Sequence, residues 1–136
     1  MEEELQAPAV VFPGAEDRPE SAYRTAHDLL SRRAPREALA IIEPALEKDP
    51  GNRGLRMLRA WAFYMRAQLG KATDELTELV DEDPSDTWAR HTLGRALERQ
   101  SRHREALPHL RLAAAMSGDI EHEVDMLRVE RVVEDL

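Results

Sequence analysis

A spacing of 34 residues between alanines is the sequence feature that most constrains the fold. Alanine occupies positions 38, 72 and 106, and the run Arg-Glu-Ala-Leu surrounds the first and the last of these. Twelve residues before each alanine lies another small residue, at Ala26, Ala60 and Gly94. Small side chains let two helical backbones approach closely. Their periodic return therefore predicts one packing arrangement that is used three times.

Helical periodicity and turn residues predict an all-α fold of seven helices. The expected ranges are 20–33, 36–48, 53–66, 71–82, 86–100, 104–116 and 119–135. Pro35 suits a first helical turn, Asp86 and Asp119 suit N-caps, and Gly118 suits a helix stop. Pro44 falls inside one predicted helix, where we expect a bend and not a break.

The same pattern resembles the tetratricopeptide repeat (TPR) family, which has a 34-residue helix–turn–helix unit. Asp-Pro pairs at 49–50 and 83–84 close the first two copies, and the third copy matches best, with Leu93, Gly94, Leu97, Ala106, Leu110 and Ala113. The resemblance implies an α-solenoid of three units, at about 19–52, 53–86 and 87–118. Arg59 departs from the family pattern, because an apolar residue is usual there.

The two ends of the chain fall outside the three units. Residues 1–19 contain Pro-rich sequence and no sustained helical period, so we expect a flexible acidic arm whose apolar triplet is Val10-Val11-Phe12. Residues 119–136 form an amphipathic segment and are expected to be a capping helix. The apolar residues expected to cover the end of the third unit are Ile120, Val124, Leu127, Val132 and Val133.

Composition argues against several classes of function. The chain has no cysteine and no long apolar run, so we expect no zinc-thiolate site and no membrane span. Its net charge of −8 argues against nucleic-acid binding. Because it has no basic N-terminal leader, we expect a cytoplasmic location. No catalytic or phosphate-loop motif is present, and no two histidines are four residues apart. We therefore expect no enzyme activity, cofactor or metal. Seventeen of the nineteen basic residues are arginine, which is typical of a GC-rich bacterial genome.

Charge differs between the helices of a unit. The expected first helix at 53–66 carries four arginines and no acid, whereas the second helix at 71–82 carries five acids and one lysine. The resemblance implies that first helices line a concave face, which would then be basic and aromatic. The candidate partner-binding residues are Tyr23, Arg24, His27, Met57, Trp61, Tyr64, Trp88, His91, Arg95 and Arg99. Trp61 and Trp88 fit a groove and a core position equally well, and Arg56 is expected on a solvated face.

These features predict a non-catalytic protein–protein interaction module that binds an acidic or amphipathic peptide. Some TPR proteins hold the C-termini of heat-shock chaperones with a carboxylate clamp. The clamp positions fall here at Tyr23, His27, Leu58, Trp88 and Thr92, and none matches. The alternative is self-association, in which the N-terminal arm or the acidic C-terminal helix occupies the groove of the same chain or of a homodimer partner.

Overall fold

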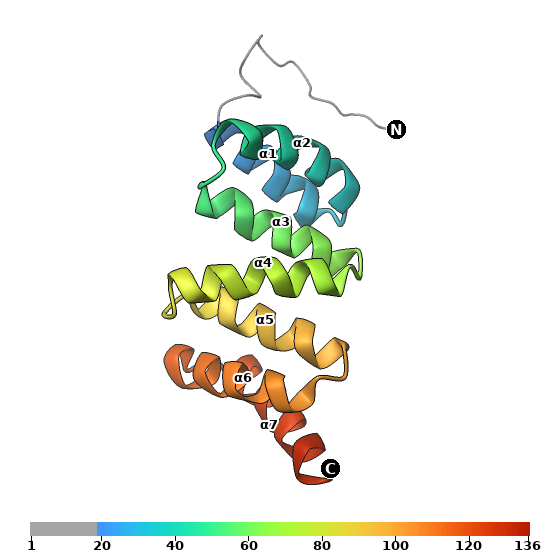
Figure 1. Ribbon diagram of the computed structural model, residues 1–136, viewed down its shortest axis with the longest axis vertical. Helices are drawn as coiled ribbons and strands as arrows, with labels where there is room; N and C mark the ends of the chain where they lie inside the picture. Colours follow the sequence, from blue (N-terminus) through green and yellow to red (C-terminus); the bar gives the residue numbers. More distant parts are fainter. Residues whose placement is uncertain (1–18) are drawn as a thin grey trace. The chain divides into compact units, whose positions relative to one another are not determined.

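The computed structural model describes residues 19–136, and all regular secondary structure in this range is helical (Figure 1). The helices are α1 (Pro19–Ser31), α2 (Pro35–Lys48), α3 (Arg53–Met65), α4 (Leu69–Glu82), α5 (Thr87–Arg99), α6 (His103–Ser117) and α7 (Ile120–Glu134). Each helix begins and ends within two residues of its predicted range, so the all-α prediction is confirmed. The predicted arm, with its Val10-Val11-Phe12 triplet, lies outside the described residues except for Pro19.

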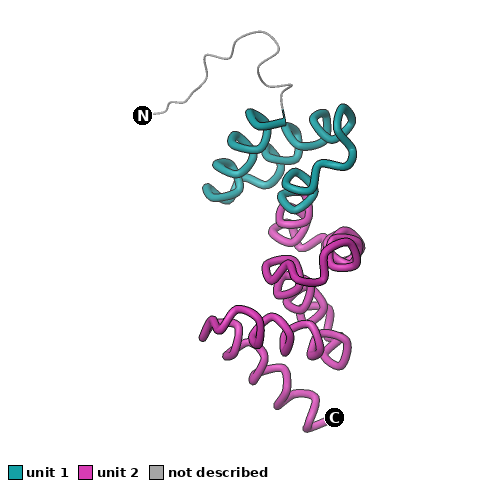
Figure 2. Tube along the Cα trace, turned by 90° about the vertical axis from the view of Figure 1, so that its left-hand side faces the viewer, with its two compact units in different colours: residues 1–58 teal, residues 59–136 magenta. Residues whose placement is uncertain are grey.

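The chain divides into two compact parts, and the boundary falls inside α3 (Figure 2). The N-terminal part ends at Leu58 and the C-terminal part begins at Arg59. In the N-terminal part α1 packs against α2. In the C-terminal part α5 packs against both α4 and α6, and α6 packs against α7. Helices that follow one another in sequence therefore pack side by side within each part.

Helices α1, α3 and α5 end in the same turn. One residue with a left-handed backbone follows each helix, namely Arg33, Ala67 and Ser101 with φ of 62°, 58° and 61°. The next backbone N–H then donates to the carbonyl five residues back, in the bonds Ala34–Leu29, Gln68–Phe63 and Arg102–Leu97 at 2.8, 2.9 and 3.0 Å. This is the Schellman motif, which usually places glycine at the left-handed position. None of the three residues is glycine, so each turn is strained.

Side-chain caps begin the helices that follow the longer turns. Asp86 accepts a hydrogen bond from Ala89 N at 3.0 Å, and Asp119 accepts one from Glu121 N at 2.8 Å. Both confirm the predicted caps. Gly118 ends α6 with φ of 66°, also as predicted. Helix α2 begins at Pro35 and runs without a break through Pro44.

The small residues of the 34-residue period lie in the core. Five of the six are alanines with no exposed surface, at positions 26, 38, 60, 72 and 106. The sixth, Gly94, is also buried, and a Cβ atom built on it would lie 2.5 Å from Leu110 Cδ2. Helices α5 and α6 therefore approach too closely for any side chain at position 94.

Helix α7 differs from its prediction. Ile120, Val124 and Leu127 were expected to cover the third unit, but they are 73%, 54% and 50% exposed. The residues of α7 that are buried are Asp125 and Val129. A hydrogen bond between Asp125 and His91 and an ion pair between Asp125 and Arg95 hold one side of α7 against α5, and much of its apolar face points away from the protein.

Candidate partner-binding surface

All ten candidate residues lie on α1, α3 or α5, and none is fully buried. The exposed members are Tyr23, Arg24, His27 and Arg99, and the half-buried members are Met57, Trp61, Tyr64, Trp88, His91 and Arg95. The two tryptophans are thus neither enclosed in the core nor fully accessible. Each retains surface with which a partner can make contact.

In the N-terminal part, two candidate residues form an exposed aromatic pair. The rings of Tyr23 and His27 stack with their centroids 5.9 Å apart and an interplanar angle of 27°. Gly54 leaves room for the tyrosine, because a Cβ atom there would lie only 3.1 Å from Tyr23 Cε2. A flat aromatic surface of this kind offers apolar contact area at low entropic cost.

In the C-terminal part, Tyr64 of α3 and Arg99 of α5 come together. The guanidinium carbon of Arg99 lies 4.8 Å from the centroid of the Tyr64 ring, within the range of a cation–π interaction. Arg99 Nη1 also donates to the Tyr64 carbonyl oxygen at 3.3 Å. The arginine is exposed but held in place, so the pair is a preorganised positive site.

Two other candidate residues, His91 and Arg95, contact a carboxylate of this same chain. Asp125 Oδ2 lies 2.7 Å from His91 Nε2 and accepts a hydrogen bond from Arg95 Nη1 at 3.3 Å. Arg128 of α7 adds a bond from Nη1 to Asp125 Oδ1 at 2.8 Å. Asp125 was missed in the sequence because only the apolar residues of this segment were expected to contact the third unit. One signal was available: Asp125 follows His91 by one 34-residue period.

The cluster fixes the charge of its members. Burial lowers the pKa of His91 from its ordinary value of 6.5, although the hydrogen bond to Asp125 opposes this shift. Burial alone would raise the pKa of Asp125, but hydrogen bonds from His91 and Arg128 outweigh it and lower the pKa. At neutral pH a neutral imidazole therefore faces an ionised carboxylate, and His91 Nε2 carries the proton that it donates. The His122 ring stacks on His91 with centroids 4.0 Å apart.

Two arginines of α3 lie close to the core. Arg59, the departure from the family pattern, bonds from Nε to Glu75 Oε1 at 2.6 Å, and Glu75 is only 9% exposed. Arg56 is 8% exposed, so its assignment to a solvated face was wrong. It lies one helical turn before the fully buried Ala60, on the same side of α3. Neither arginine is therefore well placed for a partner.

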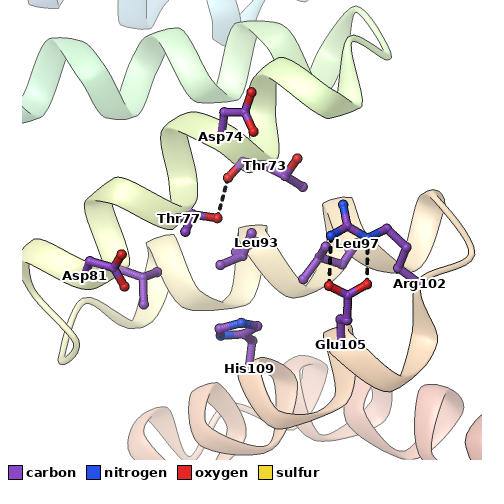
Figure 3. Close-up of a pocket in the computed structure, with 10 residues that line it drawn as sticks. Thr73, Asp74, Thr77, Asp81, Leu93, Leu97, Arg102, Glu105 and His109 are labelled. Carbon is purple, nitrogen blue, oxygen red and sulfur yellow. Dashed lines mark hydrogen bonds and ion pairs between the residues drawn. The ribbon is translucent and has the colours of Figure 1, made fainter.

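A cavity of about 310 Å³ lies among α4, α5 and α6 (Figure 3). Arg102 and Glu105 pair at its rim through two bonds of 2.8 Å. The hydroxyl of Thr77 donates to the carbonyl oxygen of Thr73 at 2.6 Å. Because these polar groups are already paired, they have little hydrogen-bonding capacity for a ligand. Across the described residues, no three His, Asp or Glu side chains gather as a metal-binding group.

A profile of the family described as tetratricopeptide repeat matches residues 29–86, from the last turn of α1 to the N-cap of α5. This stretch of the chain is similar to the TPR family. The Arabidopsis OM64 TPR domain has a similar structure, with a TM-score of 0.77 and 19% identity over 85% of this chain and 97% of that domain. The fold of this chain is thus the all-α helical repeat that the sequence predicts.

Two further relatives extend the comparison. The second TPR domain of human RPAP3, in complex with the HSP70 peptide SGPTIEEVD, matches with a TM-score of 0.73 and 16% identity over 88% of this chain and 98% of that domain. The inactive TPR repeat-containing thioredoxin TTL3 of Arabidopsis thaliana is 29% identical over 88% of this chain. This chain spans 17% of that relative's length. Within residues 19–136, none of its helices has the length and apolar character needed to cross a membrane.

Proposed function

We propose that this chain is a protein–protein interaction module that binds a carboxylate-rich peptide through the first helices of its C-terminal part. The observation that carries the proposal is the Tyr64–Arg99 pair. Because the ring holds the guanidinium in place, Arg99 loses less side-chain entropy when it binds a ligand. One of its five N–H donors contacts the Tyr64 carbonyl, and the others are suited to a bidentate bond to a carboxylate.

Neighbouring residues support an extended ligand. Arg95 lies one turn before Arg99 on the same side of α5, and the half-buried Trp61 lies one turn before Tyr64 on α3. Arginine and tryptophan are the side chains that most often dominate binding energy at protein interfaces. A segment that alternates acidic and apolar residues matches this combination of charge and aromatic surface.

The RPAP3 domain supports the proposal at the level of ligand chemistry. That domain is in complex with SGPTIEEVD, a peptide with three acidic side chains. In this chain Tyr23, His27 and Leu58 stand at positions where the chaperone-binding clamp has its own residues. We therefore propose an acidic peptide that is held by Tyr64 and Arg99, and not a chaperone tail held by that clamp.

The test is a binding array of nine-residue peptides graded by their content of Asp and Glu, read by fluorescence anisotropy. Binding is expected to rise with acidic content and to weaken about 10- to 100-fold in the Arg99→Ala variant, because a charge-assisted hydrogen bond contributes about 1.5–3 kcal/mol. The matched control is Arg104→Ala, which removes an exposed arginine from a second helix. Circular dichroism confirms that each variant is folded.

Two results would contradict the proposal. One is equal binding of acidic peptides and of their Asn and Gln counterparts. The other is an Arg99→Ala variant that binds as the unmodified chain does. A loss of equal size in Arg104→Ala would show that only overall charge is being measured.

A second candidate function is occupation of this surface by the acidic C-terminal helix of the same chain, which the contacts of Asp125 with His91 and Arg95 favour. If α7 competes with a peptide, Asp125→Asn is expected to raise the affinity for acidic peptides. Glu123→Gln is the matched control, because it removes one negative charge from an exposed position of α7. Unchanged affinity in Asp125→Asn would exclude competition.

A further inference from the structure

Helix α5 shows how a first helix is covered on two opposite sides. On one side Arg99 contacts Tyr64 of the preceding first helix, α3. On the other side Arg90 contacts His109 of the following second helix, α6. Arg90 and Arg99 are nine residues, or about two and a half turns, apart and therefore lie on opposite sides of α5. The side that faces α6 also includes the buried Gly94.

Helix α7 contacts the preceding first helix, as α5 does, but no described second helix covers its other side. Its Asp125 meets α5 through His91 and Arg95, as Arg99 of α5 meets α3. Ile120 and Leu127 lie about 140–160° around the helix from Asp125, on the side that corresponds to the α6-facing side of α5. There the two residues are 73% and 50% exposed. No described helix covers this side of α7.

The uncovered side of α7 is continuous with a hollow against α6. A cavity of about 260 Å³ lies between the two helices. Small residues of α6, Ala114 and Ala115, line one wall, and Glu123 and Met126 of α7 line the other. Glu123 lies one turn before Leu127, so the hollow and the apolar stripe form one surface. We call this surface, with Ile120, Val124, Leu127 and Arg131, the α6–α7 slot.

We propose that the α6–α7 slot is a docking site for an amphipathic α-helix of a partner protein, which takes the place of a second helix against α7. The chemistry of the occupant follows from α6, which covers the corresponding side of α5 with the buried residues Ala106, Leu107, Leu110 and Ala113. A matching helix presents small and aliphatic residues at a helical spacing of three and four.

Charge adds a second requirement. Arg131 lies one turn beyond Leu127 on the same side of α7, and it is exposed. By contrast, Arg111 at the other wall already pairs with Glu130 at 2.8 Å. An acidic residue near one end of the docked helix would therefore meet Arg131. This surface is separate from the peptide site at Tyr64 and Arg99, so a result that contradicts one proposal leaves the other unaffected.

The probe is a synthetic peptide that copies residues 68–83, a second helix of this chain that has buried Ala72, Leu76 and Leu79 and several acids. The full chain, labelled with ¹⁵N, is titrated with the peptide and followed by NMR. Chemical-shift changes are expected in α7 and in the wall of α6 that faces it. Because an isolated helix of this length is only partly formed, a second measurement tethers the same segment to the C-terminus and records hydrogen exchange of α7.

The slot variant is Leu127→Glu, and the matched control is Leu112→Glu, which changes an exposed leucine of α6 that does not line the slot. We expect the α7 shifts and at least tenfold slower exchange in the tethered chain, both lost in Leu127→Glu and kept in Leu112→Glu. Absence of both effects, or their persistence in Leu127→Glu, would overturn the proposal. Sedimentation showing that the chain alone dimerises, and that Leu127→Glu abolishes the dimer, would overturn it in favour of a second copy.

Discussion

The Gly94→Ala substitution tests how closely α5 and α6 pack. An alanine Cβ at this position would lie 2.5 Å from Leu110 Cδ2 and 2.6 Å from Leu110 Cγ. Leu110 has no exposed surface, so its side chain has no free space into which to move. The Ala106 carbonyl oxygen, 3.5 Å from the added atom, lies at ordinary contact distance. The clash is therefore with one side chain and not with the backbone.

Two opposing effects set the magnitude. Replacing glycine with alanine inside a helix normally stabilises it by about 1 kcal/mol. Inserting a methyl group into a packed core costs about 1–3 kcal/mol. Because the added atom overlaps with a fully buried side chain, we expect the cost to exceed the gain. Gly94→Ala should then lower the free energy of unfolding by about 1 kcal/mol.

A double-mutant cycle with Leu110→Ala isolates the clash. Leu110→Ala alone should cost about 2–5 kcal/mol, because it leaves a cavity. It also removes both atoms that overlap with the new methyl group. In that background Gly94→Ala should stabilise the protein by about 1 kcal/mol, so the effect of the substitution changes sign. The coupling between the two sites is then about 2 kcal/mol, the difference between these two effects.

The assay is urea unfolding followed by circular dichroism, in which a change of 1 kcal/mol shifts the midpoint by about 0.5 M. Gly70→Ala on α4 is the control, because its added Cβ would meet nothing within 4 Å beyond its chain neighbours and the backbone of its own helix. This control should raise the midpoint. A Gly94→Ala variant that raises the midpoint as the control does would show that α5 and α6 have room for the methyl group. An effect of the same sign with Leu110 present and absent would show that Leu110 is not the clashing residue.

Three further predictions concern other parts of the chain. Ala67→Gly should raise stability by about 0.5–1 kcal/mol, because it relieves a left-handed residue with φ of 58°; a lower melting temperature would contradict this. Arg59→Met should lower the free energy of unfolding by about 1.5–3 kcal/mol, because the buried Glu75 loses its hydrogen bond from Arg59. The double variant with Glu75→Leu should recover most of that stability in urea unfolding. Burial lowers the pKa of His91 and His109 below 6.5, so below about pH 7 the unfolded chain binds more protons than the folded chain. The free energy of unfolding should therefore fall as the pH drops from about 7 to 5. An unchanged free energy of unfolding across this range would contradict the lowered pKa values.

Much of the fold was predictable because the same local rules recur at each copy. The small residues at 38, 72 and 106 indicated close helix packing, and all three are fully buried. Asp86 and Asp119 indicated helix starts, and both cap as expected. These signals depend on neighbours within one or two turns of chain. The left-handed residues of the turns, such as Ala67, gave no such signal because none of the three is a glycine.

The candidate surface was predictable in part. Helical spacing and the family resemblance assigned the aromatic and arginine residues to first helices, which the structure bears out. The pairing of Tyr64 with Arg99 joins residues 35 positions apart. Which two side chains meet over that distance depends on the angle and offset at which two helices pack. No local pattern encodes that geometry.

Local patterns in the sequence were enough to predict the helices of residues 19–136, their approximate bounds and the 34-residue spacing of their small residues. The contacts of Asp125 with His91 and Arg95 depend on how the helices pack together. So does the exposure of Ile120, Val124 and Leu127. The physical reason is that amphipathic periodicity shows which residues share a side of a helix. It does not show which side a neighbour covers. In α7 the hydrogen bond of Asp125 with His91 and its ion pair with Arg95 hold one side against α5, and much of the apolar side remains exposed.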